Sequence, residues 1–345
     1  TPHLEHTQNS TIPAAALIMK SFYPTTISFL LSISTAVSGE TEEGHSTNVS
    51  TKSVIAGFKP GIKSIFEKQG PPIRLDGRRR LQWPFAQSCT TPMSEWITEE
   101  SNKLSYSTLN DYVDLQIGLL PFLSKALFDD NEGDEFIGEN GEYTNELFER
   151  NSQLERFWRL ENPDISTSES LLLGAHGSML RDTDKLARIA EIVYEVNAGY
   201  SYEDVALLVQ GVVEDMPGTY SNPLLTFNAV ALSSLAASRE FGIDVVDSIV
   251  MGDGIIEAIQ AQGFGTDGPD FVLSHEFAHI LQYELGNDPP VGGYSPGENR
   301  RQEMMADAMA SYFMAHPEGG AHSVEEVDEL HVTASLLGDY QFTQP

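Results

Sequence analysis

The chain has 345 residues, of which 51 are acidic and 20 basic, giving a formal net charge of −31 at pH 7. Such acidity repels nucleic acid and anionic membrane surfaces, so neither is an expected partner. The single cysteine, Cys89, excludes an intrachain disulfide, which a domain of this size can fold without. Cys89 lies in a loop-like stretch and is interpreted as an ordinary free thiol rather than a nucleophile.

Residues 1–38 are interpreted as upstream residues followed by a secretory signal peptide. Lys20 precedes a short apolar stretch, and Ala36-Val37-Ser38 resembles a signal-peptidase site. The alternative is a buried apolar segment near an ordinary N-terminus. Residues 1–18 precede the internal Met19, and the sequence does not decide whether they belong to the natural product. We expect a secreted, extracellular protein without stable membrane insertion, because no later stretch reaches transmembrane length.

Residues 39–82 form a polar to basic N-terminal region or a short propeptide. Asn48-Val49-Ser50 is a possible glycosylation site, and Arg78-Arg79-Arg80 is either a processing site or an exposed basic linker. The catalytic domain is expected to occupy residues 83–345.

Within that domain, the acidic run 129–135 is predicted to be a solvated loop, because its glycine is not at the sixth position that an EF-hand calcium loop requires. Apolar periodicity predicts helices over residues 182–196, 202–213 and 224–240, and a short strand over 247–251. His176 is expected to be structural rather than a metal ligand.

The most informative stretch is residues 270–285, which contain His275-Glu276-Phe277-Ala278-His279. On a helix, positions i and i+4 project from nearly the same face, so both imidazoles can reach one metal ion. Glu276 can then act as general base on water activated by that ion. The surrounding residues are apolar, so the helix should be largely buried. The alternative is a pair of ordinary histidines with a glutamate between them.

A catalytic zinc ion needs a third protein ligand, and the predicted helix over residues 300–313 offers Glu303 and Asp307 on one face. Glu303 could complete the ligand set, and Asp307 could accept the free ring N–H of a ligand histidine. The alternative is a solvated acidic face. If neither residue is the ligand, Glu284, Asp288 and Glu298 are the next candidates.

These motifs, together with residues 252–259, resemble the gluzincin-type zincin metallopeptidases, and most closely the microbial neutral zinc metallopeptidases. The resemblance covers roughly residues 243–313. It implies that His275, His279 and Glu303 bind Zn²⁺, that Glu276 is the catalytic base, and that Asp307 supports a ligand. It also implies that the strand over 247–251 is an edge strand beside the cleft. Gln302 stands where the best-known gluzincins carry Asn.

The expected fold class is therefore a mostly helical α+β zincin domain, in which the motif helix packs on the ligand-bearing helix beside a small edge sheet. The expected function is zinc-dependent hydrolysis of peptide bonds in a peptide or protein substrate. The alternatives are a metal-binding protein without peptidase activity and a zinc hydrolase of a non-peptide substrate. The oligomeric state is not predicted. A developing oxyanion needs a further donor, and the candidates after the motif are Tyr294, Tyr312, His316, His322, His331 and Tyr340.

Overall fold

The computed structural model describes residues 50–59, 92–128, 135–161, 171–241, 245–288, 290, 295–320 and 323. Over these ranges the chain is mostly helical, with one two-stranded and one three-stranded sheet, as expected for an α+β protein. None of the helices in these ranges is long and apolar enough to cross a membrane. The expectations that lie outside the described residues concern the signal segment, Asn48, Arg78–Arg80, the domain start at 83, Cys89 and the acidic run up to 134.

The three-stranded sheet has the order β2 (Leu171–Ala175), β5 (Ser248–Gly252), β4 (Ala229–Leu232). β2 and β5 run parallel, and their last residues, Ala175 and Gly252, are paired. β4 is antiparallel to β5, with Ala231 opposite Ile249. The C-terminal ends of β2 and β5 therefore lie next to each other, so the segments that follow these two strands start side by side.

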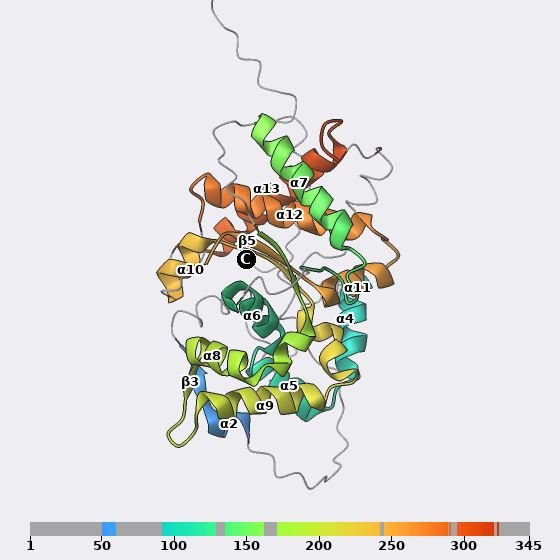
Figure 1. The fold of residues 1–345 in the computed structure, drawn as a ribbon. Helices are drawn as coiled ribbons and strands as arrows, with labels where there is room; N and C mark the ends of the chain where they lie inside the picture. Colours follow the sequence, from blue (N-terminus) through green and yellow to red (C-terminus); the bar gives the residue numbers. More distant parts are fainter. Residues whose placement is uncertain are drawn as a thin grey trace, which may run out of the picture.

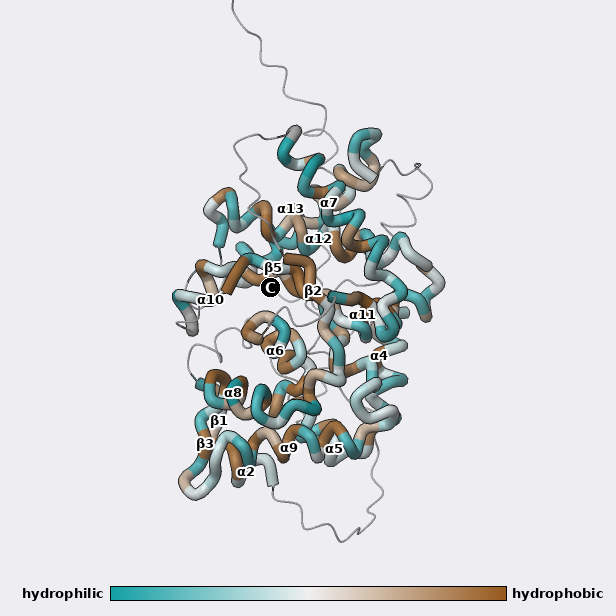
Figure 2. The backbone as a smooth tube through the Cα atoms, in the orientation of Figure 1, coloured by the Kyte–Doolittle hydropathy of each residue, from teal (hydrophilic) through white to brown (hydrophobic). Residues whose placement is uncertain are grey.

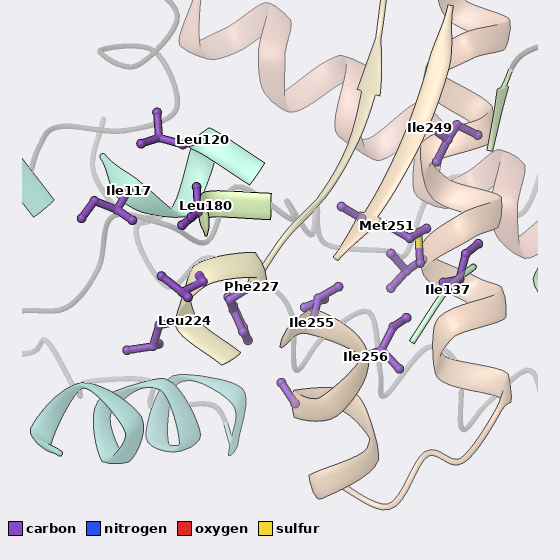
Figure 3. Close-up of a cluster of buried hydrophobic side chains, with 14 of the residues drawn as sticks. Ile117, Leu120, Ile137, Leu180, Leu224, Phe227, Ile249, Met251, Ile255 and Ile256 are labelled. Carbon is purple, nitrogen blue, oxygen red and sulfur yellow. The ribbon is translucent and has the colours of Figure 1, made fainter. Parts of the chain in front are cut away.

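Helices cover both faces of this sheet. Alternate side chains of a strand point to opposite faces, so Leu173 and Val250 pack with Phe122 of α6 (Leu120–Phe128), while Ile249 and Met251 belong to the larger core. In Figure 1, α12 (Asp267–Glu284) and α6 lie on opposite sides of β5. Figure 2 shows that β2 and β5 are hydrophobic, as expected for strands that are covered on both sides. In Figure 3, side chains from β5 and from the start of the following helix gather in one cluster.

Helices α12 and α13 (Pro296–Ala315) pack against each other, with Ala278, Ala306 and Ala310 buried. α13 begins with a capping box, in which the Ser295 side chain accepts from the Glu298 N–H and the Glu298 side chain accepts from the Ser295 N–H. α7 (Thr144–Glu161) also packs on α12, and Arg150 of α7 forms an ion pair of 2.6 Å with the buried Asp270 of α12. Three helices therefore form the layer above one face of the sheet (Figure 1).

The other helices lie mainly on the opposite side of the sheet or at its end (Figure 1). Residues 51–58 also pack on the domain, because the strand Ile55–Phe58 (β1) pairs antiparallel with the strand Tyr194–Val196 (β3). The remaining elements are α2 (Thr51–Val54), β1 (Ile55–Phe58), α4 (Pro92–Asn102), α5 (Tyr106–Asp114), η1 (Ile117–Leu119), η2 (Gly177–Arg181), α8 (Thr183–Val193), β3 (Tyr194–Val196), α9 (Tyr202–Glu214), η3 (Thr219–Ser221), η4 (Pro223–Thr226), α10 (Ser234–Phe241) and α11 (Asp253–Ala261).

Three of the predicted elements need correction. The helix expected over 224–240 is wrong, because η4, β4 and α10 occupy these residues. Its apolar residues suit a strand equally well, and pairing with β5 decides between the two. The helix expected over 182–196 ends at Val193, and its last three residues form β3. The strand expected over 247–251 exists as β5, but it is the central strand, and β4 is the edge strand packed against α12.

Candidate metal centre

The two histidines of α12 and Glu303 of α13 point their ligand atoms at one another. Oε2 of Glu303 lies 3.2 Å from Nε2 of His275 and 3.3 Å from Nε2 of His279. The two Nε2 atoms are 3.1 Å apart. Within the described part of the chain, this is the group of histidine and carboxylate side chains that could hold a metal ion. The helical spacing of the two histidines and the close packing of α12 on α13 together create this convergence.

The other ring nitrogen of each histidine is held by a polar side chain. Nδ1 of His275 lies 2.9 Å from Oδ1 of Asp307, and because an ionised carboxylate can only accept, Nδ1 is the donor. Nδ1 of His279 lies 3.0 Å from Oε1 of Gln282, whose Nε2 donates to the carbonyl of Gln302 at 2.8 Å. In the neutral form of both rings, the proton is therefore on Nδ1, and the lone pair of Nε2 points into the shared space.

The geometry and chemistry of this group fit a zinc ion. At the ~2.0–2.1 Å bond lengths of zinc to nitrogen and oxygen, neighbouring ligand atoms of a tetrahedral site lie about 3.4 Å apart. The separations of 3.1 to 3.3 Å are close to that value. Atoms with lone pairs can converge this closely only when protons or a cation lie between them. Two histidines and one glutamate leave a fourth position for water or substrate, as in catalytic zinc sites.

Burial and mutual charge shift the pKa values of the three ligand candidates. Burial acts to lower the pKa of His275, but the hydrogen bonds to Asp307 and Glu303 outweigh it and hold the pKa well above its usual value. Burial also acts against the charged form of His279, and the Glu303 carboxylate more than offsets it, so that this pKa is raised. The pKa of Glu303 is lowered despite its burial, because both histidines stabilise its charge. The attraction between the histidine rings and the Glu303 carboxylate therefore raises the histidine pKa values and lowers that of the glutamate.

Glu276 lies next to this cluster and is almost completely buried, with 4% of its surface exposed. Burial raises the pKa of its carboxyl group, and the charges of His275 and His279 oppose that rise. The backbone N–H of Ala231 in β4 donates to the Glu276 carboxylate. The carbonyl of the same residue accepts from the Tyr283 hydroxyl at 3.2 Å. Both backbone groups of Ala231 are thus engaged by α12, so the edge strand lies in hydrogen-bonding reach of Glu276.

The remaining sequence candidates are not brought to the cluster. Glu298 caps α13, and Asp288 accepts from Ser233 at 2.5 Å. Tyr312 and His316 pack with Phe157 of α7. Glu284 is at the last position of α12 and is not part of the group. The other oxyanion candidates, Tyr294, His322, His331 and Tyr340, lie outside the described residues.

Two residues of this region were not predicted from the sequence. Gln282, which is 1% exposed, connects His279 to the backbone of α13. Its position three residues after His279 places it on the same face of the helix, and that spacing could have identified it. Ala231 could not have been found, because its contact with Glu276 depends on how β4 packs against α12.

Comparisons of the chain with known protein families, with curated proteins and with solved structures found no match. The possible metal site is therefore defined by the side-chain geometry of α12 and α13.

Proposed function

We propose that this protein is a zinc-dependent hydrolase of the zincin type that cleaves peptide bonds. The observation that carries the proposal is the convergence of His275, His279 and Glu303, with the buried carboxylate of Glu276 beside them. These are the residue types that catalytic zinc sites use, in a geometry that leaves one position open. When bound, zinc activates water and polarises the carbonyl that is attacked.

Each residue around the cluster has a defined role in this proposal. Glu276 takes the proton of the attacking water and later delivers it to the leaving amine. Its raised pKa suits both steps, because a group that accepts and then releases a proton works best with a pKa near the working pH. Asp307 and Gln282 fix the rings of His275 and His279 with Nε2 directed at the ligand site.

The proposal is tested with zinc-loaded protein and a library of internally quenched peptides. We expect peptide cleavage that stops when zinc is removed by chelation and returns when zinc is restored. Glu276→Gln should remove the cleavage, whereas Glu95→Gln on the exposed surface of α4 should leave it unchanged. A folded, zinc-loaded protein that cleaves no peptide would contradict the proposal. Turnover of ester or non-peptide amide substrates alone would then point to a different hydrolase.

A further inference from the structure

A second site lies where the parallel strands β2 and β5 end. His176 directly follows β2, and Asp253 directly follows β5. These residues line a cavity of about 300 Å³, together with the loop before α7, the turn around Tyr220 and one side of α11. None of the proposed metal ligands lines it. The cavity is also separated in space from the Glu276 side of the sheet. Ala231, which bonds to Glu276, is paired with Ile249 of β5, and Asp253 follows Ile249 by four residues, which corresponds to about 13 Å along a strand.

The buried centre of this cavity is a histidine–aspartate pair. Nδ1 of His176 lies 2.8 Å from Oδ2 of Asp253, and because the carboxylate accepts, Nδ1 is the donor. The imidazole is 6% exposed, and the Phe136 ring stacks on it with a centroid separation of 3.9 Å. In the neutral ring, Nε2 is then an acceptor.

Asp253 has a second feature that points to a ligand. Its other oxygen, Oδ1, is buried and has no hydrogen-bond partner among the described residues. An unpaired buried carboxylate oxygen is costly, and such atoms usually have a partner in the functional state. The residues around the cavity therefore include one buried acceptor, Asp253 Oδ1, that no donor of the described residues satisfies, and the neutral His176 ring adds Nε2 as a second acceptor.

The walls of the cavity add negative charge. Glu139, Glu142 and Glu257 line it, and no lysine or arginine of the described residues does. The pKa of Glu257 is raised by partial burial and by the charges of Glu100 and Glu139, and the charge of Lys103 opposes that rise. Two cations lie nearby: Lys103 pairs with Glu100 at 2.5 Å, and the Arg181 guanidinium lies 4.0 Å from the centroid of the Tyr220 ring. The cavity thus offers several acceptors and a net negative charge.

The acceptors are spread around the cavity rather than gathered at one point. Among the described residues, only His275, His279 and Glu303 come close enough together to hold a metal ion. The dispersed carboxylates around His176 instead match a ligand whose own donors are spread over several atoms. Ammonium offers three N–H donors and guanidinium five, and neither accepts a hydrogen bond.

We propose that this cavity binds a small organic cation with a protonated amine or guanidinium group. The carboxylate of Asp253 and Nε2 of His176 receive its N–H groups, and Glu139 and Glu257 attract its charge at the entrance. Phe136 offers an aromatic ring beside the same space, and such rings attract cations. The volume of about 300 Å³ is at the small end of ligand pockets, which suits a single amine-bearing or arginine-like group. This inference does not depend on the proposed peptidase activity.

The test is a calorimetric titration of the full chain at low salt with butylguanidinium and with its uncharged analogue butylurea. We expect saturable binding of butylguanidinium and none of butylurea. The double variant Glu139→Gln, Glu257→Gln changes two exposed side chains and should weaken binding about 3- to 30-fold, as expected for exposed charge pairs. Asp253→Asn should weaken it further. Glu203→Gln on the exposed start of α9 also removes a negative charge, and it should leave the affinity unchanged.

A blocked Gly-Arg-Gly peptide distinguishes the two sources of the guanidinium group. Tighter binding of the peptide than of butylguanidinium assigns the cavity to a basic side chain of a polypeptide, whereas equal or weaker binding assigns it to a free small molecule. The proposal is overturned if neither cation binds, if butylurea binds equally well, or if Glu203→Gln weakens binding as much as the double variant. Circular dichroism of each variant shows that the comparison is made on folded protein.

Discussion

Two buried histidines in this protein make the same local contact but lie in different surroundings. Nδ1 of His275 is 2.9 Å from Asp307, and Nδ1 of His176 is 2.8 Å from Asp253. Beyond Nε2 of His275 lie His279 and Glu303, whereas His176 lines a cavity with dispersed carboxylates. The histidine–carboxylate pair fixes the tautomer in both places. What differs is that further ligand atoms converge at Nε2 of His275, and this distinguishes a candidate metal centre from a candidate site for an organic cation.

The largest expected effect concerns Glu276, the proposed catalytic base next to His275. Glu276→Gln keeps the shape of the side chain but cannot accept a proton, so turnover should fall by roughly 10²- to 10⁴-fold. Zinc content should stay at the wild-type level, because Glu276 is not one of the converging ligands. The measurement is kcat on a cleaved peptide together with zinc per protein. Near-normal turnover in the zinc-loaded variant would remove Glu276 from the mechanism.

A second variant removes one of the three side chains that converge on the candidate metal site. Glu303→Ala removes the oxygen that lies within 3.3 Å of both histidines, so its zinc should be lost to a mild chelator that leaves the wild type loaded. Zinc content against chelator concentration measures the difference. Wild-type retention would show that the third ligand lies elsewhere.

A smaller loss is expected where only the support of a ligand is removed. Asp307→Ala takes away the acceptor of the His275 Nδ1–H, and such supporting contacts typically account for about 10- to 100-fold in metal affinity or activity. The same chelator titration applies. If Asp307→Ala empties the site while Glu303→Ala does not, Asp307 is the ligand and the gluzincin-type assignment is wrong.

A change at His176 should lower the stability of the protein but should not change its zinc content. His176→Ala removes the hydrogen-bond partner of the Asp253 carboxylate, which should cost about 1–3 kcal/mol in the free energy of unfolding. Urea denaturation of metal-loaded protein measures that loss. Zinc loss from a folded His176→Ala protein would show that the two regions are not independent.

The smallest expected effect is the number of protons that the histidine cluster releases when zinc binds. The pKa of His275 is raised well above its usual value in the metal-free protein and that of Glu303 is lowered, so at pH 7 the histidine carries a proton and the glutamate does not. A ligand histidine must be neutral, so zinc uptake at pH 7 should release about one proton or more. The number should fall as the pH rises through the pKa of His275. Calorimetry in buffers of different ionisation enthalpy counts these protons, and no release would contradict the raised pKa.

The sequence predicts those parts of the molecule that depend on local patterns. The helix predicted around His275 and His279 is confirmed as α12, which spans Asp267–Glu284, and the helix that carries Glu303 is confirmed as Pro296–Ala315. Spacing within each helix also identifies His275, His279 and Glu303, which the structure brings together. The roles of Glu276 and Asp307 stay predictions, although both side chains lie at the cluster.

Elements that depend on distant partners could not be predicted in the same way. Residues 229–232 become a strand because β5 is beside them, and their apolar residues alone fit a helix as well. His176 was expected to be structural, and its pairing with Asp253 becomes visible only when β2 and β5 are aligned in parallel. Helical periodicity is a property of a short window, whereas sheet pairing joins segments from far apart in the chain.

The sequence distances within the two regions also have a consequence for folding. His275 and Glu303 are 28 residues apart, whereas His176 and Asp253 are 77 residues apart. The entropic cost of closing a loop grows as (3/2)RT ln n, so the longer closure costs about 0.9 kcal/mol more. Bringing α12 and α13 together from an unfolded chain therefore costs less loop-closure entropy than bringing His176 and Asp253 together. We expect zinc ligands to be in reach of one another before the cavity at the ends of β2 and β5 exists.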